Sequence, residues 1–462
     1  MGPMRQRCPR RRAGRILRAL ALSAALLGPG GRAARADGAF PDEMQVFVPA
    51  DQPQRIVVSA TFGLLVSEDD GQSWRWICET AVSPSLVFLY QVGPAPDHLL
   101  LGCAQQGLSI SRDGGCSWQT AGGGLSGAYV PDAFPDPADP LHLLVVATPL
   151  SSGSSVPMGL YESRDGGQSF GGALYADPQL GLLTGVEIAA SSPQTYYLTR
   201  YRSQAMQPSL LRSDDAGATW QTFDLGALGP VPVRLAAVDP TDAQTAYLRV
   251  VNPTSGDALA ITSDGGQTVR TAIQLSEPMS AFLRRSDGAL LVGTRDSGGF
   301  LSTDGGQTFA PWPGAPHLRA LAERAGSLYA AGDNWKDNFA VGVSRDGGAS
   351  WQPLLRFNGI CGPALCPTIQ ASCADGWAVL ERMFEIPADV CGQTPPDGGT
   401  NPPPPPDQGC AAATGPGSPG APAALGLGAG LLLAALGLLG RGRVRRAASR
   451  RRARRCPDAR RP

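Results

Sequence analysis

The octapeptide Ser67-Glu-Asp-Asp-Gly-Gln-Ser-Trp74 decides the fold, because close copies of it recur along the chain. Every copy has a hydroxyl residue first, Asp third, Gly fifth, a hydroxyl residue seventh, and an aromatic or apolar residue last. The copies start 44, 52, 50, 49, 40 and 42 residues apart, which is a regular internal repeat. The six further copies are Ser111–Trp118, Ser163–Phe170, Ser213–Trp220, Thr262–Val269, Ser302–Phe309 and Ser344–Trp351.

Each octapeptide predicts a tight turn between two strands. Its Asp can accept hydrogen bonds from backbone N–H groups, and its Gly can adopt positive φ. A second turn precedes each octapeptide, as at Asp239-Pro240 between two apolar runs. Four antiparallel strands per repeat predict an all-β fold, a seven-bladed β-propeller of four-stranded antiparallel blades over residues 42–358. Residues 359–393 are expected to close the ring, with a strand at Trp377–Arg382.

The octapeptide resembles the Asp-box, or BNR repeat, of bacterial sialidases, sortilin-like receptors and related propellers. Only Val269 departs from the aromatic final position, and it is still apolar. The resemblance implies turns on the outer rim, away from any reaction site, so the Asp residues are expected to be structural. These residues are Asp69, Asp113, Asp165, Asp215, Asp264, Asp304 and Asp346.

The two ends of the chain predict sorting segments. The N-terminus combines an arginine-rich start, an apolar stretch and a small-x-small cleavage site at Ala36, as in a signal peptide. The C-terminus has a stiff proline run, a short apolar span and an arginine cluster. The expected segments are a signal peptide over 1–36, the propeller with a Cys-rich closing segment over 37–393, a Pro/Gly-rich linker over 394–422, a transmembrane or sorting helix over 423–440, and an Arg-rich cytoplasmic tail over 441–462.

The linker, the Gly409-Cys410 pair, the short span and the arginine cluster together resemble the MYXO-CTERM sorting tail of myxobacteria. That resemblance implies processing at or near Cys410 and attachment at the cell surface. A plain single-span anchor is the alternative, and it places the propeller on the same side of the membrane. The expected location is exported, membrane-anchored or at the cell surface, with release after tail processing also open.

Charge is segregated along the chain, although 39 basic and 39 acidic residues give a net charge of zero. Nine arginines lie in residues 1–36, and eleven arginines with one acid lie in residues 441–462. The segment between them therefore has 39 − 20 = 19 basic and 39 − 1 = 38 acidic residues, a net charge of −19. Such a surface repels nucleic acid and favours cationic partners, or else serves only solubility.

Seven cysteines within 37–393 predict an oxidising compartment. Cys103 and Cys116 flank one strand at opposite ends, so they are not expected to pair with each other. Cys78–Cys103 is the favoured pair, which leaves Cys116 over. Two disulfides are expected among the remaining cysteines, which are Cys361, Cys366, Cys373 and Cys391.

The loops between the second and third strands of the blades are unequal, and two of them are rich in cations and aromatics. In propellers these loops share one face with the links between blades, where ligands usually bind. Loops of this composition are typical of a recognition surface, or they are solvated decoration. The candidate ligand-binding residues are Arg200, Tyr201 and Arg202 in the fourth blade and Asp333, Trp335 and Lys336 in the seventh.

Two function classes compete. The first is a non-catalytic binding or assembly propeller at the cell surface, with a surface protein or polysaccharide as partner, no nucleic acid and a monomeric state. The second is a glycoside hydrolase, sialidase-like or glucan-cleaving, because such enzymes share the octapeptide. Hydrolysis needs a pair of carboxylates across a cleft, and the candidate acids Glu187 and Glu381 have no identifiable partner. The sequence predicts no catalytic residue, no metal site and no cofactor, and it favours the binding class.

Overall fold

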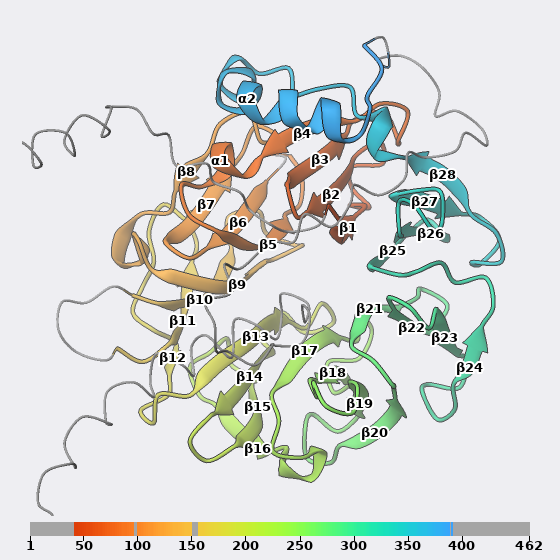
Figure 1. Cartoon of the computed structure of the whole chain (residues 1–462). Coiled ribbons are helices and arrows are strands. Elements are labelled where there is room, and N and C mark those ends of the chain that lie inside the picture. The colour runs from red at the N-terminus through yellow and green to blue at the C-terminus, as the bar shows by residue number, and fades with distance from the viewer. Residues whose placement is uncertain (1–40, 97–98, 150–155, 389, 391–462) are drawn as a thin grey trace, which may run out of the picture. The chain divides into compact units, whose positions relative to one another are not determined.

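The computed structural model describes residues 41–96, 99–149, 156–388 and 390. Within these residues, the strands form seven sheets, each of four antiparallel strands. The sheets are arranged as blades around a common axis (Figure 1). The predicted all-β, seven-bladed propeller is confirmed.

Every blade is built from four strands that follow one another in the chain. The first four blades are β1 (Glu43–Phe47), β2 (Ile56–Ala60), β3 (Gly63–Ser67) and β4 (Arg75–Cys78); β5 (Val87–Val92), β6 (Leu100–Ala104), β7 (Gly107–Ser111) and β8 (Gln119–Thr120); β9 (Tyr129–Pro135), β10 (Leu143–Thr148), β11 (Gly159–Ser163) and β12 (Tyr175–Ala176); and β13 (Leu182–Ile188), β14 (Tyr196–Arg202), β15 (Gln207–Ser213) and β16 (Gln221–Asp224).

The last three blades follow the same order. They are β17 (Val233–Val238), β18 (Ala246–Val250), β19 (Ala258–Thr262) and β20 (Arg270–Gln274); β21 (Met279–Arg284), β22 (Leu290–Thr294), β23 (Gly299–Ser302) and β24 (Ala310–Trp312); and β25 (Ala320–Arg324), β26 (Ser327–Ala331), β27 (Val341–Ser344) and β28 (Gln352–Leu355). The described helices are α1 (Glu79–Val82), α2 (Pro367–Met383) and the 3₁₀ turns η1 (Gly123–Leu125), η2 (Gly226–Leu228) and η3 (Phe357–Gly359).

The first strand of each blade lies innermost, since the first strands of neighbouring blades contact one another, as β9 contacts β13 and β1 contacts β25. The chain then runs outward, so the turns fall on two faces. The octapeptide face carries the octapeptides and the turns between first and second strands. The B–C face carries the turns between second and third strands together with the links from blade to blade.

The octapeptide turns are held by their Asp side chains. In the first turn, Asp69 accepts hydrogen bonds from the Ser73 backbone N–H at 2.9 Å, the Ser73 hydroxyl at 2.5 Å and the Ser67 hydroxyl at 2.8 Å. Gly71 has φ of +90°, where a side chain would be strained. Trp74 is buried and donates through Nε1 to the Leu354 carbonyl of the seventh blade at 3.1 Å. The turn therefore fixes its own hairpin and also a contact between blades.

The ring closes without any exchange of strands between the first and last blades. The expected strand at Trp377–Arg382 is wrong, because these residues belong to the helix α2. The segment has proline in the first helical turn and a Leu-Glu-Arg-Met end of good helix formers, with Ile369, Cys373 and Leu380 buried along one face. Closure instead uses the segment just before α2, where the Trp76 backbone N–H donates to the Gly362 carbonyl at 2.9 Å.

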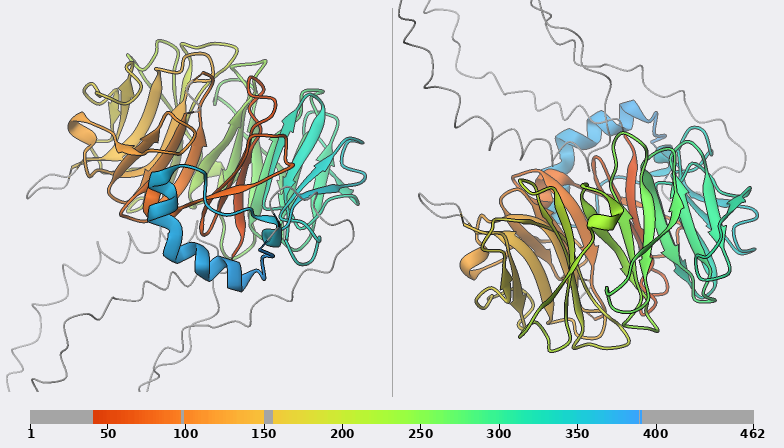
Figure 2. Two further views of the ribbon diagram at one scale, coloured as in Figure 1. Left: turned by 90° about the horizontal axis from the view of Figure 1, so that it is seen from above. Right: turned by 90° about the horizontal axis from the view of Figure 1, so that it is seen from below.

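Two disulfides attach the C-terminal segment to the first two blades. Cys78 pairs with Cys373 and Cys116 with Cys366, with Cα atoms 5.6 Å and 5.4 Å apart. The predicted Cys78–Cys103 pair is wrong, and so is the expectation that Cys366 and Cys373 pair within their own cluster. Cys103 is a buried thiol inside the second blade, and burial raises the pKa of its thiol. The helix α2 lies against the edge of the first blade in both further views (Figure 2).

The two disulfides indicate an oxidising compartment. Across the described part of the chain, no helix has the length and hydropathy needed to cross a bilayer. The expected signal peptide with Ala36, the linker, the 423–440 span, the arginine-rich tail and the cysteines Cys391 and Cys410 lie outside the described residues.

Candidate functional site

Arg200, Tyr201 and Arg202 lie in the strand β14, where the sequence predicted a loop. The hairpin loop is shorter than expected and spans only residues 203–206, between β14 and β15. Tyr201 is buried, and its hydroxyl donates to the Pro230 carbonyl at 3.1 Å. Arg200 is 4% exposed, so neither residue is available as an exposed loop side chain.

The two arginines share one carboxylate, that of Asp177, which no sequence pattern had marked. Arg202 binds it with two hydrogen bonds, from Nε at 2.9 Å and Nη2 at 2.8 Å. Arg200 lies 3.7 Å from the same carboxylate and donates to the Tyr175 hydroxyl at 2.5 Å. Burial alone would raise the pKa of Asp177, but the Arg202 hydrogen bonds and the Arg200 charge outweigh it and lower that pKa. The Asp177 side chain is completely buried, whereas 22% of the Arg202 side chain is exposed to solvent.

Asp333 organises the loop between β26 and β27 in the seventh blade. One of its carboxylate oxygens accepts the backbone N–H groups of Trp335 and Lys336, both at 3.0 Å. Its other oxygen accepts a hydrogen bond from Arg319 at 3.1 Å. Trp335 is half-buried, and its ring meets that of Phe357 edge-on at 5.8 Å between centroids. Asp333 therefore shapes the loop, and Trp335 packs on the core.

An exposed row of charges connects this loop to the sixth and first blades. Lys336, the one lysine in the chain, lies 3.1 Å from Asp296 on the sixth blade, and both are exposed. Beneath them Arg319 donates to Asp42, just before β1, at 2.7 Å. Arg295 of the sixth blade also pairs with Asp42. The buried Arg319, paired with Asp42 and Asp333, thus supports exposed charges where the ring closes.

The six predicted residues lie toward the B–C face of their blades, some of them buried in β14, and they do not converge on one site. They occupy the fourth and seventh blades, which are three positions apart in a ring of seven. The structure therefore contains two separate clusters, which we call the blade-4 cluster (Asp177, Arg200, Arg202) and the blade-7 cluster (Asp333, Lys336, Asp296). Whether either binds a ligand stays a prediction.

Two carboxylic acids lie at the inner edge of the ring, on β9 and β13. Asp132 accepts the Val186 backbone N–H at 3.0 Å and the Ala133 backbone N–H at 2.9 Å. Glu187 accepts a hydrogen bond from the backbone of Val238. Both side chains keep some accessible surface, yet the neighbouring inner strands enclose them. Desolvation accordingly raises the pKa of Asp132 to about 7 and that of Glu187 to about 8.

Further polar groups surround these acids. Gln91 hydrogen-bonds Asp132, and the positive charge of Arg234 on β17 acts on both Asp132 and Tyr129. Burial is the main cause that lowers the pKa of Arg234. Sequence reasoning singled out Glu187 without a partner and missed Asp132. The signal it lacked was that both acids fall in first strands, whose exposed edges meet along the axis.

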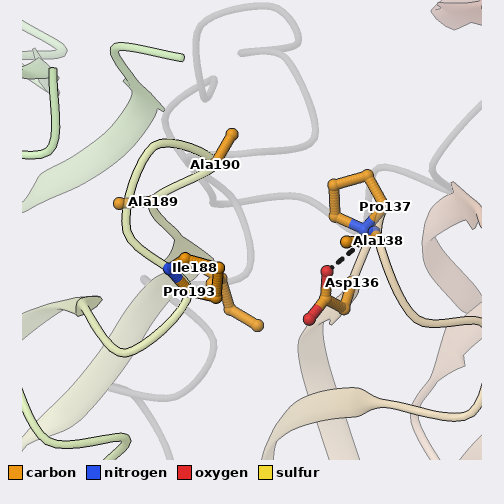
Figure 3. Close-up of a pocket in the computed structure, with 7 residues that line it drawn as sticks. All are labelled: Asp136, Pro137, Ala138, Ile188, Ala189, Ala190 and Pro193. Atoms are coloured by element: carbon orange, nitrogen blue, oxygen red, sulfur yellow. Dashed lines mark hydrogen bonds between the residues drawn. The ribbon is translucent and has the colours of Figure 1, made fainter. Parts of the chain in front are cut away.

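A shallow pocket opens on the octapeptide face between the third and fourth blades (Figure 3). Its volume is about 170 Å³, smaller than the pockets that usually hold a cofactor or substrate. Asp136 borders it and lies 2.8 Å from His142, whose other ring nitrogen lies 2.9 Å from Glu162. The other lining residues are Pro137, Ala138, Ile188, Ala189, Ala190 and Pro193.

The Asp side chains of all seven octapeptides are occupied in the same way. The equivalent Asp346 accepts the Ser350 N–H at 2.9 Å and the Ser344 hydroxyl at 2.7 Å. Hydrogen bonds of this kind hold the pKa of all seven carboxyls below the usual range, against desolvation where the turn is partly buried. Throughout the described ranges, no three His, Cys, Asp or Glu side chains are placed to hold a metal ion.

Comparison with known proteins gives matches among solved structures alone. No family model and no curated protein matches the sequence. An ancestral GH74 enzyme is 13% identical with a TM-score of 0.50, covering 68% of this chain and 46% of its own. A Mycobacterium tuberculosis puromycin-hydrolyzing peptidase is 11% identical with a TM-score of 0.51, covering 69% and 56%. YCF48 from Cyanidioschyzon merolae is 14% identical with a TM-score of 0.44, covering 63% and 92%.

The chain thus spans about half the length of the first two of these structures. At such low identity, the similarity establishes the propeller fold and nothing finer.

Proposed function

We propose that this protein is a non-catalytic binding or assembly propeller that meets a protein or glycan partner through its B–C face. The observation that carries the proposal is the Lys336–Asp296 pair. Both side chains are exposed, at 51% and 73%, and they belong to loops of adjacent blades. Asp333, which accepts the Lys336 backbone N–H and pairs with Arg319, braces the Lys336 loop, so little conformational freedom is lost on binding.

The two inner acids, Asp132 and Glu187, also support a non-catalytic role. A glycoside hydrolase needs two carboxyl groups facing each other across a substrate cleft. Asp132 and Glu187 each accept a backbone N–H from the next blade, which gives them a role in joining blades. Each acid is therefore oriented along the ring toward its neighbour.

A glycoside hydrolase, sialidase-like or glucan-cleaving, is the second candidate. One observation favours it: the pKa of Glu187 is raised to about 8, and a general acid must keep its proton at neutral pH. In this alternative Glu187 is the acid and Asp132 the second carboxyl group. Release of reducing ends from a polysaccharide, abolished by Glu187→Gln, would establish it.

We further propose that the propeller acts outside the cytoplasm, as a monomer held at the cell surface by its C-terminal segments. The oxidising compartment indicated by the disulfides supports this location. The net charge of −19 between the two arginine-rich ends argues against a nucleic-acid partner.

The test is a glycan and polysaccharide array, together with a displayed peptide library, probed with the full chain and its variants. Lys336→Gln and Asp296→Asn are expected to weaken binding about tenfold or more, the effect of truncating a residue that contributes strongly to an interface. Glu381→Gln, an exposed acid on α2, is the matched control and should bind as the parent protein does. Retained binding in the Lys336 and Asp296 variants, or turnover of any sugar, contradicts the proposal.

A further inference from the structure

The end of β14 on the B–C face shows exposed apolar side chains on strained backbone. Leu180 is 52% exposed with φ of +56°, and Met206 is 57% exposed with φ of +51°. A left-handed conformation costs a residue with a side chain roughly 1–2 kcal/mol. Strain of this kind is concentrated at binding and switch sites.

In other blades, the turn between the second and third strands has residues that adopt positive φ readily. The turns between second and third strands reach positive φ at Gly63, Gly107, Gly256, Gly298 and Asn338. Glycine and asparagine adopt this conformation readily. Only the fourth-blade turn among those described in full uses a large apolar residue there, Met206. The apolar Met206 side chain is therefore exposed to water at a position that glycine would occupy with less backbone strain.

These two side chains flank the blade-4 cluster. Leu180 closes the turn that begins at Asp177, through a backbone hydrogen bond of 2.9 Å. Met206 closes the hairpin that follows Arg202, through a backbone hydrogen bond to Ser203 of 3.4 Å. Because β13 and β15 pair with β14 on its two sides, Leu180 and Met206 lie on either side of the Arg202 end.

The cluster between them carries an excess of positive charge. Two guanidinium groups share the single carboxylate of Asp177. Arg200 is more than nine-tenths buried, and its Nε has no hydrogen-bond partner among the described residues. Arg202 remains partly exposed, so solvent or a ligand can reach this charge. The cluster is therefore a cationic spot in a segment whose net charge is −19.

We infer that this surface binds an acidic residue of a partner protein, with apolar residues beside it in the partner's sequence. The acidic group meets Arg202, and the apolar side chains cover Leu180 and Met206. A protein segment fits better than a polysaccharide, because an anionic sugar offers carboxylates but no aliphatic side chains for Leu180 and Met206. The inference rests on the proposed binding function and names the partner chemistry of one part of the face.

Met206→Gly separates this inference from a merely structural role. The variant relieves strain, so its free energy of unfolding should be equal to or higher than that of the parent protein. It also removes the exposed apolar side chain, so affinity for the partner should fall about tenfold. Met206→Leu, which keeps an apolar side chain, is the matched control and should retain affinity. Loss of binding together with gained stability is a result that a structural role does not produce.

The probe is a random twelve-residue peptide library displayed on phage and selected on the full chain. Selected peptides should share an Asp or Glu with Leu, Ile, Met or Phe within two positions. Their affinity, measured by fluorescence anisotropy, should fall in Met206→Gly, Leu180→Gly and Arg202→Gln, and should weaken as salt rises. Polygalacturonate serves as the carboxylate-bearing polysaccharide competitor.

Three results overturn the inference. The first is a set of selected peptides without the acidic and apolar signature. The second is unchanged affinity in Met206→Gly. The third is binding of polygalacturonate with the same sensitivity to Arg202→Gln and Met206→Gly. If Lys336→Gln weakens binding while the fourth-blade variants do not, the proposed function stands and this inference fails. If nothing binds at all, the proposed function itself fails.

Discussion

The carboxylate of Asp132 accepts the backbone N–H of Val186 at 3.0 Å, and so joins the innermost strands of the third and fourth blades. Glu187 does the same toward Val238 in the fifth blade. Gln45 accepts the Tyr90 backbone N–H at 3.2 Å and joins the first blade to the second. Inner strands have a free edge whose N–H groups need acceptors. Side chains from the preceding blade supply them.

These inner acids predict a pH dependence of stability. Their pKa values are raised on folding, to about 7 for Asp132 and about 8 for Glu187. The folded protein therefore binds more protons than the unfolded chain between about pH 4 and pH 8. The stability that they contribute is complete below this window and is lost as pH rises through it. Urea unfolding at pH 5.5 and pH 8.5, roughly either side of the raised values, should show this loss.

Asp132→Asn and Glu187→Gln test its origin. Both amides can still accept the backbone N–H, but neither can ionise. At high pH the variants should unfold at higher urea concentrations than the parent protein. Together the two substitutions should raise the free energy of unfolding by about a few kcal/mol. Glu381→Gln is the control and should keep the parental pH slope. An unchanged slope in the inner variants would show that other groups are responsible.

Removal of one octapeptide carboxylate should destabilise its blade. Asp69→Ala removes the acceptor of three hydrogen bonds, from Ser73 N–H, Ser73 Oγ and Ser67 Oγ. A loss of about 1–3 kcal/mol is expected, measured by thermal unfolding, because a backbone donor in the turn loses its partner. Asp69→Asn, which keeps an acceptor, should lose less. Equal losses in the two variants would mean that the acceptor does not matter.

The same carboxylates predict acid sensitivity. Their pKa values are lowered on folding, so their contribution is present above the unfolded value near pH 4 and is lost as pH falls below it. Unfolding followed by tryptophan fluorescence between about pH 5 and pH 2 should show this loss. The Asp69→Ala variant should have a shallower acid limb than the parent protein.

The disulfides should carry much of the stability of the closed ring. They bridge sequence separations of 295 and 250 residues. Serine replacement of either pair should lower the free energy of unfolding by about 2–5 kcal/mol. Reduction of the parent protein with dithiothreitol should destabilise it as much as replacing both cysteine pairs does. Dithiothreitol should not destabilise the variant that lacks both pairs any further. Cys103→Ala should leave the response to dithiothreitol unchanged, and a change there would mean that Cys103 takes part in a disulfide.

Arg324 should be needed where the seventh blade meets the first. It is buried and donates to the Arg55 carbonyl at 2.8 Å and to the hydroxyl of Tyr329 at 3.1 Å, and it also pairs with Asp70. Lysine cannot reproduce this fork of donors. Arg324→Lys should cost about 1–3 kcal/mol in chemical unfolding. Arg345→Lys, on an exposed octapeptide arginine, should be close to neutral.

The sequence predicted the blades because each is a local unit. Every octapeptide is followed by the fourth strand of its own sheet, so the turn at Ser67–Trp74 already implies the pairing of β3 with β4. The four-strand order follows from turns less than 20 residues apart. Local turn chemistry and strand alternation thus specify both the fold class and the number of blades.

Contacts between distant segments could not be predicted from the sequence. In the sequence Arg200 and Arg202 look like loop residues. In the structure they lie in a strand and pair with Asp177, which is more than twenty residues earlier in the chain. The Cys78–Cys373 pair depends on where α2 docks, which spacing along the chain does not encode. The sequence offered Glu187 as a lone candidate acid and did not mark Asp132, because only closure of the ring brings their strands together.

The disulfide between Cys373 and Cys78 also has a mechanical consequence. Any pull on the chain beyond Val390 first reaches α2, whose Cys373 is tied to the first blade. Force then enters the ring at its first blade and bypasses the hydrogen bonds of β28, the last strand of the seventh. A tethered propeller of this design would resist peeling from its C-terminal blade, and its reduced form would unravel from that blade at lower force.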